Sequence, residues 1–381
     1  TLLSLAALGV YLLKQPHRSA AKAARGGWKS MLFFSLAALL LAGPPFWLTS
    51  LVPTLYYSAN RFTLPFMLGS VLLLTAFLVW LPLRHWHKAV LVALLAALSI
   101  GVHFQSANAY RRSWDTQNRF FWQLAWRMPA LEPGTTLLTN DLPIQFCSDN
   151  SLTSPLNWMF SPDPDPSRQM KYMLYWPTVR LGIGLADLQP GLPIQQDYLA
   201  TTFQGSTSQI ISIQYAPPAC LRVLDPEIEP ENIMITELMR ASARLSDTRW
   251  ILPAPAGQSA RPPAEIFGPE PAQNFCYYYQ KADLARQLKD WPQVAALGDS
   301  AFSLGDSSND PMERLVFIEG YAHVDNWESA LDLSRKAAEI TPLMRPPLCR
   351  LWQRITRETD VSQAQQAAAA EAQQSFCQIT P

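Results

Sequence analysis

The stretch 64-LPFMLGSVLLLTAFLVWLPL-83 decides how this chain folds, because its 20 residues include no charged side chain. A helix of this length crosses the hydrocarbon core of a bilayer, which is about 30 Å thick. The stretches 31-MLFFSLAALLLAGPPFW-47 and 89-AVLVALLAALSIGVHF-104 are also uncharged, and they reach spanning length with interfacial residues at their ends. The sequence therefore predicts transmembrane helices over 31–49, 64–83 and 88–104.

Acidic residues are confined to the later part of the chain. No Asp or Glu precedes Asp115, whereas the first 104 residues carry eight Lys and Arg. The remainder carries 22 basic and 30 acidic residues, so the net charge of zero combines a basic first part with an acidic second part. Three buried helices of a soluble protein are the alternative interpretation. Such helices would normally carry carboxylates on their exposed faces, so we assign residues 1–104 to a lipid bilayer.

The distribution of basic residues predicts the orientation in the membrane. The loop Lys14–Lys29 holds five Lys and Arg and the loop Arg84–Lys88 holds two, whereas Ser50–Thr63 holds only Arg61. Because positive loops stay in the cytoplasm, we expect an integral, multi-pass protein whose C-terminal two thirds are extracytoplasmic. Residues 1–13 are apolar but too few to span a bilayer, so we interpret them as the end of a truncated transmembrane helix.

All five cysteines lie in the part assigned to the outside: Cys147, Cys220, Cys276, Cys349 and Cys377. That compartment permits disulfides, and the odd number leaves at least one thiol unpaired within the chain. The sequence does not give the connectivity, and buried free thiols remain the alternative. The spacings match no zinc-ligand pattern, so we predict no metal and no cofactor.

Residues 105–253 are predicted to form a small mixed α/β domain. The expected elements are a helix over 105–132 ended by Pro133-Gly134, strands over 135–139, 209–215 and 221–224, a loop-rich stretch over 140–167 and a helix over 235–246. Residues 254–271 are rich in proline, and we interpret them as an extended, semi-rigid linker.

An internal repeat follows the linker. The segment that begins Asp290-Trp291 aligns with the one that begins Asn326-Trp327, at an offset of 36 residues. Each copy follows a helical stretch, which predicts two helical hairpins over 272–357. The residues expected at helix contacts are Trp291, Ala301, Tyr321, Trp327, Ala330, Ala337 and Pro342. The final stretch, 358–381, contains an Ala- and Gln-rich run that we interpret as a frayed helix or a disordered tail.

The second copy resembles a tetratricopeptide repeat. Tyr321, Ala330, Ala337 and Pro342 stand at the spacings that this family uses. Two positions depart from the family pattern: Ile318 stands where the family prefers glycine, and Ser334 where it prefers an aromatic residue. The resemblance implies helical hairpins that bind a protein partner or support a neighbouring domain.

The loop predicted to face outward contains Tyr56, Tyr57, Asn60 and Arg61. The guanidinium of an arginine suits phosphate because it donates two parallel hydrogen bonds. The run Arg61-Phe62-x-Leu64-Pro65 resembles a turn in multi-helix glycosyltransferases that use polyisoprenyl-phosphate sugars. That resemblance implies a polyisoprenyl-phosphate site here, with the catalytic acid upstream, since no acidic residue precedes Asp115. Anchoring in lipid headgroups is the alternative role for these side chains.

A second candidate site is acidic. Asp141, Asp149 and Asn150 cluster around Cys147, and paired carboxylates perform acid–base chemistry or bind cations. Turn and helix-capping roles are the alternative, because no further ligand stands at a recognisable spacing. Nucleic acid is not expected as a partner, because the one basic run is explained by membrane orientation.

Two hypotheses for the function follow. The first is a membrane-anchored extracytoplasmic protein that is not catalytic in this part of the chain and binds a partner through tetratricopeptide-like hairpins. The second is the C-terminal part of a membrane glycosyltransferase dependent on a lipid-linked sugar. A fragment of a transporter fits less well, because no charge lies in the interior of a predicted span.

Overall fold

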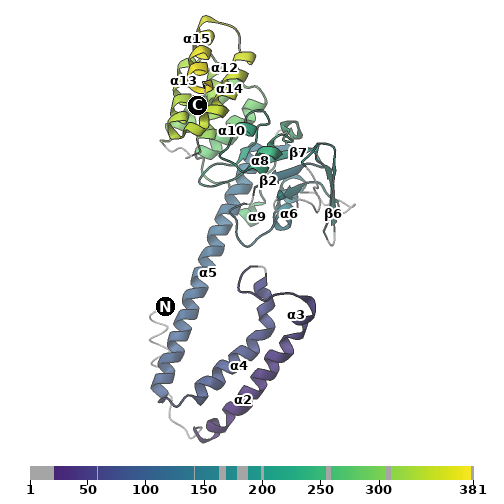
Figure 1. The fold of residues 1–381 in the computed structure, drawn as a ribbon, viewed down its shortest axis with the longest axis vertical. Helices are drawn as coiled ribbons and strands as arrows, with labels where there is room; N and C mark the ends of the chain where they lie inside the picture. The colour runs from purple at the N-terminus through teal and green to yellow at the C-terminus, as the bar shows by residue number, and fades with distance from the viewer. Residues whose placement is uncertain are drawn as a thin grey trace. The chain divides into compact units, whose positions relative to one another are not determined.

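The structure is a computed structural model that describes residues 21–57, 59–140, 142–162, 169–177, 188–198, 201–254, 259–305 and 310–378. The chain divides into two compact units, Thr1–Arg111 and Arg112–Pro381, which we call the N-terminal unit and the C-terminal unit (Figure 1). The truncated helix predicted over 1–13 lies outside the described residues.

The N-terminal unit is helical. It contains α2 (Ala21–Ala42), α3 (Pro44–Thr49), the 3-10 turn η1 (Ala59–Thr63), α4 (Leu64–Trp80) and the first part of α5 (His85–Arg127). Three segments are long and apolar enough to cross a membrane: Gly27–Thr49, Ala59–Trp80 and His85–Arg127. The first and third contain the spans predicted over 31–49 and 88–104, and the second covers residues 64–80 of the span predicted over 64–83. Large apolar side chains such as Phe33 and Leu41 are exposed on these helices, as expected of surfaces that face lipid.

Helices α2 and α4 pack against each other through small residues. The Oγ of Ser35 donates a hydrogen bond to the backbone oxygen of Gly69 at 2.8 Å, and both residues are buried. A Cβ atom on Gly69 would lie 2.6 Å from the Cγ of Leu39, so only glycine permits this approach. In lipid, the hydrophobic effect does not drive helices together. Small residues, which allow close packing, and interhelical hydrogen bonds hold them in contact.

Helix α5 is longer than the sequence suggested, because the predicted span over 88–104 and the predicted helix over 105–132 are one continuous helix. Its 43 residues correspond to a length of about 65 Å. The helix ends at Arg127 and not at Glu132. The residue before Pro129 is disfavoured in helical geometry, and the next residues form strand β1 (Ala130–Leu131), which pairs with β9 (Ile251–Leu252).

Two further sheets follow in the C-terminal unit. The first has the order β4-β2-β7-β8, from β2 (Thr136–Thr139), β4 (Met173–Tyr175), β7 (Ile210–Gln214) and β8 (Arg222–Val223). Strand β2 is parallel to β4 and β7, whereas β8 is antiparallel to β7. The second has the order β3-β6-β5, from β3 (Gln169–Met170), β5 (Pro193–Tyr198) and β6 (Thr201–Ser206). The strands predicted over 135–139, 209–215 and 221–224 are present with shorter bounds.

The stretch predicted to be loop-rich over 140–167 contains a helix, α6 (Asp149–Phe160), so that prediction is wrong there. Ser148 and Ser151 form a capping box at its start, and Leu152, Leu156 and Met159 are buried. The remaining short elements are η2 (Glu229–Glu231), α8 (Glu237–Ala243), η3 (Thr248–Trp250) and α9 (Ala264–Phe267). Helix α8 lies inside the helix predicted over 235–246.

The proline-rich stretch is fastened to the end of α5 and is not a free spacer where it is described. The ring of Phe267 is buried and stacks on Trp114 with ring centroids 5.4 Å apart. The Nδ2 of Asn118 donates to the backbone oxygen of Phe267 at 2.9 Å. The extended linker was predicted from its proline content, but its single Phe supplies enough apolar surface to bind it to the helix.

The rest of the C-terminal unit is helical (Figure 1). It contains α10 (Phe275–Gln287), α11 (Trp291–Ser303), η4 (Pro311–Glu313), α12 (Arg314–His323), α13 (Trp327–Ile340), η5 (Pro342–Met344), α14 (Arg345–Glu358), α15 (Gln363–Ala372) and the π-helical turn η6 (Gln373–Cys377). Helix pairs α10–α11 and α12–α13 are the two copies of the repeat.

The turns of the two hairpins match in geometry. Lys289 and Asp325 both adopt φ of 59°, and they stand 36 residues apart like the sequence repeat. The next residue caps the following helix in each copy: the Asp290 side chain accepts from the backbone N–H of Gln293, and the Asn326 side chain from that of Ser329. The repeat seen in the sequence is therefore a repeat of backbone conformation as well.

Most of the residues expected at helix contacts are buried there. Ala301, Ala330 and Ala337 have no exposed surface, and Tyr321 and Trp327 are also buried. Trp291 stacks face to face on His323, with ring centroids 3.7 Å apart. Pro342 is exposed and begins η5, so it marks a turn between helices and does not contribute to packing.

The departures from the tetratricopeptide pattern have local explanations. Buried Ser334 accepts a hydrogen bond from the Nε1 of Trp352 at 3.0 Å, so the aromatic ring at this contact comes from α14. Ile318 is buried, and the close approach of helices falls on Gly320, where a Cβ atom would lie 2.3 Å from Val294.

The Ala- and Gln-rich run near the chain end, predicted as a frayed helix or a disordered tail, forms a packed helix. Residues 363–372 form α15, with Ala368 and Ala372 buried. A disulfide between Cys349 and Cys377 joins the end of this segment to α14. The alanine-rich run is thus the second helix of a third hairpin, in which small side chains allow close helix approach.

We predict that Gly69→Leu disrupts the contact between α2 and α4. The added side chain has no room beside Leu39, and overpacking of this kind costs about 1–3 kcal/mol. Gly101→Leu is the matched control, because Gly101 lies in the apolar part of α5 and has open space at its Cβ. Thermal unfolding of the protein in detergent should show a lower midpoint for Gly69→Leu alone. Equal midpoints for the two variants would contradict the packing.

Candidate functional site: the ion-pair cluster of the C-terminal unit

The residues that flank strand β8 are buried in the hydrophobic core of the hairpins. Cys220 lies just before β8 and Ile228 after it, and both are buried in the same cluster as Phe275 and Phe317 of the helices. A disulfide joins Cys220 to Cys276 at the start of α10. These apolar and covalent contacts place the end of β8 against helices α10, α12 and α14.

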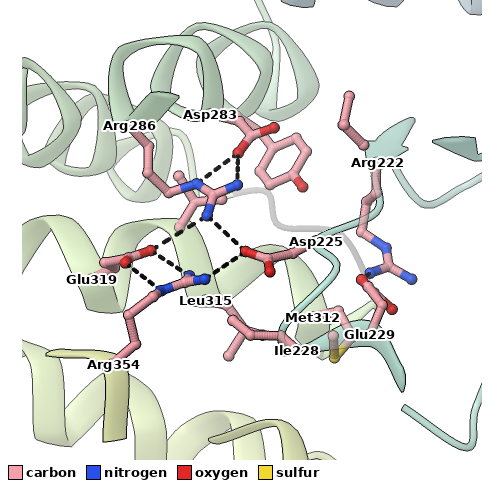
Figure 2. A pocket seen from close by; sticks show the side chains of 13 residues that line it. Arg222, Asp225, Ile228, Glu229, Asp283, Arg286, Met312, Leu315, Glu319 and Arg354 are labelled. Atoms are coloured by element: carbon pink, nitrogen blue, oxygen red, sulfur yellow. Dashed lines mark hydrogen bonds and ion pairs between the residues drawn. The ribbon is translucent and has the colours of Figure 1, made fainter. Parts of the chain in front are cut away.

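Six charged residues meet at this place, and we call them the junction cluster: Arg127, Asp225, Asp283, Arg286, Glu319 and Arg354. Figure 2 shows all of them except Arg127. They come from α5, from the segment after β8, and from α10, α12 and α14. Three are basic and three are acidic, so the cluster is formally neutral.

Asp225 is the link between the sheet and two helices. One of its carboxylate oxygens accepts from Arg354 at 2.7 Å and from Arg286 at 3.2 Å. Arg354 also donates to both oxygens of Glu319, at 2.8 and 2.9 Å. Figure 2 shows the guanidinium groups of Arg286 and Arg354 lying between the carboxylates of Asp225 and Glu319. Each acid is thus neutralised by arginines from a different helix.

Asp283 extends the cluster to α5. It accepts from the Nε of Arg127 at 2.5 Å and from the Nη2 of Arg286 at 2.7 Å. Arg127 has no exposed surface, and its Nη1 donates to Gln287 at 2.9 Å. An arginine so fully removed from water must be paired, because an isolated buried charge is very costly.

A second ion-pair group lies beside the cluster. Buried Arg222 of β8 pairs with Glu229 and, through its Nε at 3.0 Å, with Asp310. The Nδ2 of Asn232 donates to the other oxygen of Glu229 at 2.8 Å. Burial raises the pKa of Glu229 despite the opposing effect of Arg222.

Electrostatics in the junction cluster favour the charged forms of its acids. Burial alone would raise the pKa of Asp225, but Arg354 and Arg286 outweigh burial and hold it at about 2. The pKa of Asp283 is likewise lowered, because Arg127 and Arg286 outweigh its burial. Both carboxylates are therefore ionised at neutral pH, and neither is available as a general acid.

The cavities beside the cluster are small. One of about 30 Å³ is lined by Asp225, Asp283 and Arg286, among others, and has room for a water molecule or two. A neighbouring one of about 200 Å³ is lined by Trp291, Lys289 and Glu358 as well as by cluster residues. Because the charges already neutralise one another, the cluster holds elements together and offers no reactive group.

One group among the described residues has the side chains of a metal site: Glu319, His323 and Glu358. Both oxygens of Glu319 accept from Arg354, whose positive charge would repel a cation. We do not assign a metal to this group.

The outer-loop residues are exposed, and a backbone hydrogen bond links two of them: the N–H of Asn60 donates to the oxygen of Tyr56 at 2.9 Å. Tyr56 is 82% exposed, and Asn60 and Arg61 are exposed. The Arg61 guanidinium lies over the ring of Phe62, 5.2 Å from its centroid. Tyr57 is also exposed at 48%. This arrangement does not test the prediction that these four residues hold a lipid phosphate, so it stays a prediction.

The two described residues of the acidic candidate site are neighbours at the start of α6. Asp149 is buried in the first turn of α6 and accepts from the backbone N–H of Asn150 at 2.8 Å, whereas Asn150 is exposed. Asp141 lies outside the described residues. Cys147 has a free, half-buried thiol, and burial raises its pKa to about 11, so it is a poor nucleophile at neutral pH.

Sequence reasoning missed the junction cluster. Its partners are far apart in the chain, as with Asp225 and Arg354, which are 129 residues apart. One signal was present: the acidic segment 225-DPEIEPE-231 and three arginines of α14 at helical spacing, Arg350, Arg354 and Arg357. Comparisons with protein-family models, with curated proteins and with solved structures found no match for this chain.

We predict that Arg354→Met destabilises the C-terminal unit by about 3–5 kcal/mol, because it removes a partner from the buried carboxylate of Glu319 and from the partly buried carboxylate of Asp225. Arg357→Met is the matched control: Arg357 is exposed and pairs with Glu227 on the surface, so little change is expected. Chemical denaturation of the detergent-solubilised chain, followed by tryptophan fluorescence, measures both. Similar losses for the two variants would contradict the buried role of Arg354.

Stability should depend on pH through Asp225. Its pKa of about 2 lies below the usual value of 3.8, so its ionised form stabilises the fold above about pH 4. This contribution, about 2 kcal/mol at neutral pH, is lost as the pH falls from 3.8 towards 2. Asp225→Asn lacks it at every pH. The difference in unfolding free energy between wild type and Asp225→Asn should therefore shrink below pH 4, and a difference independent of pH would refute the assignment.

Proposed function

We propose that this chain is a multi-pass membrane protein whose C-terminal unit lies outside the cytoplasm and binds a protein partner through its helical hairpins, without a catalytic role of its own. The spanning helices supply the anchor. The hairpins supply a repeated helical surface of the kind that binds proteins, in line with their resemblance to tetratricopeptide repeats.

The observation that carries the proposal is the pair of disulfides. Cys220–Cys276 and Cys349–Cys377 both lie in the C-terminal unit. Disulfides persist in oxidising compartments and are rare in the cytoplasm. The basic loop Arg84–Lys88 lies at the start of α5, and positive loops stay inside. Both arguments independently favour an α5 that runs outward.

A binding role is favoured over catalysis by the state of the reactive groups. The charged residues of the junction cluster neutralise one another, and the Cys147 thiol has a raised pKa. Neither supplies the poised acid, base or nucleophile that catalysis requires.

The glycosyltransferase alternative stays a prediction, and one observation favours it. Arg61 lies in the turn η1, which leads directly into α4 at Leu64-Pro65. This is the place that a similar turn has in the enzymes that use polyisoprenyl-phosphate sugars. Under this alternative, exposed Arg61 would meet the lipid-linked phosphate.

Cysteine accessibility tests the orientation. In a Cys147→Ser background, Lys336→Cys should react with a membrane-impermeant maleimide on intact cells, because Lys336 is exposed on α13. Arg84→Cys, also exposed but in the basic loop, should react only after the cells are permeabilised. Labelling with the opposite pattern would place the C-terminal unit in the cytoplasm and overturn the proposal.

A further inference from the structure

Helix α14 carries a row of arginines that already binds an acidic segment of the same chain. Arg357 pairs with Glu227 at 2.8 Å, Arg354 with Asp225 at 2.7 Å, and Arg350 with Glu231 at 2.9 Å. We call residues 225–231 the internal acidic segment. Its end, Glu231, contacts the arginine of this row that lies nearest the start of α14.

A groove of about 470 Å³ begins where the internal acidic segment stops, and Glu231 and Arg350 are part of its lining. The disulfide Cys349–Cys377 and the buried ring of Phe376 supply apolar surface. Arg345 and Gln353 of α14 add polar groups. The groove therefore continues the surface on which α14 holds the internal acidic segment.

The charge of the groove is incompletely neutralised. Arg350 is half-exposed and pairs with Glu231, which leaves Arg345 as the second cation of the lining. Arg345 is exposed and has no ion pair with any described residue. A partner that supplied a carboxylate beside Arg345 would give this arginine an ion pair, as the three arginines of the row already have.

We propose that this groove binds an extended acidic segment of the protein partner, with a carboxylate at Arg345 and an apolar side chain against the Cys349–Cys377 disulfide. The inference rests on the proposed function and specifies its partner. The internal acidic segment has the same chemistry, since its carboxylates alternate with Pro and Ile. Extended segments of this composition fit a narrow groove because proline limits the entropy lost on binding.

The test uses the full chain in lipid nanodiscs and a fluorescein-labelled peptide, DPEIEPE, which copies the internal acidic segment. Fluorescence anisotropy should report binding that weakens as salt is raised, because the ion pairs in the groove are exposed. Arg345→Glu should weaken the affinity by at least about tenfold, because it places like charges together. Gln353→Glu, which adds a carboxylate without removing an ion pair, should also weaken it.

The controls separate the groove from general electrostatics. Lys336→Glu makes the same change of charge on α13, outside the groove, and should leave the affinity unchanged. The neutral peptide NPQIQPQ should not bind. Binding that is unaffected by Arg345→Glu, equal binding of the neutral peptide, or no binding of DPEIEPE would each overturn the proposal. Maleimide labelling tests the orientation separately, so failure of the groove and failure of the proposed function are distinguishable.

Discussion

The C-terminal unit depends on a single electrostatic constraint: the carboxylate of Asp225, whose side chain is only 15% exposed, must be neutralised by arginines that come from other elements. Arg286 of α10 and Arg354 of α14 meet this requirement together, and Glu319 of α12 balances the excess positive charge. Removing α12 or α14 would leave the cluster with an unbalanced charge, and removing α10 would leave Arg127 without Asp283. Either change in a region of low polarity is far more costly than losing an exposed pair. The sheet and the hairpins are therefore held in one arrangement, which the Cys220–Cys276 disulfide and the burial of Ile228 in the hairpin core reinforce.

The helices of the N-terminal unit are held together by different interactions. No carboxylate exists in its sequence, so ion pairs cannot hold its helices together. Close approach takes their place: Gly69 lets α4 contact α2, and Ser35 supplies an interhelical hydrogen bond. One chain thus uses small residues between its apolar helices of membrane length and charged residues in its C-terminal unit.

The use of α14 links this architecture to the proposed function. In a free helical-repeat array, a row of arginines is available to an acidic partner. Here Arg354 is engaged by Asp225 and Glu319, and Arg357 by Glu227, so this part of the helix supports the neighbouring sheet. In the proposed function, the start of the same helix, at Arg345 in the groove, is the part that binds an outside ligand. Support of a neighbour and recognition of a partner are then two uses of one helical surface.

The sequence by itself determined the features that depend on local composition and period. Apolar runs without charge predicted the spanning helices, and the offset of 36 predicted two hairpins whose caps repeat in the structure. Strands β5 and β6 were missed because their residues are mostly polar and do not alternate, and α6 was missed because turn-forming residues at its start concealed its apolar face. Only the tertiary structure decided the disulfide pairing and the junction cluster. Both join residues that are remote in the chain, and no local pattern records which distant charge or thiol the folded backbone brings within bonding distance.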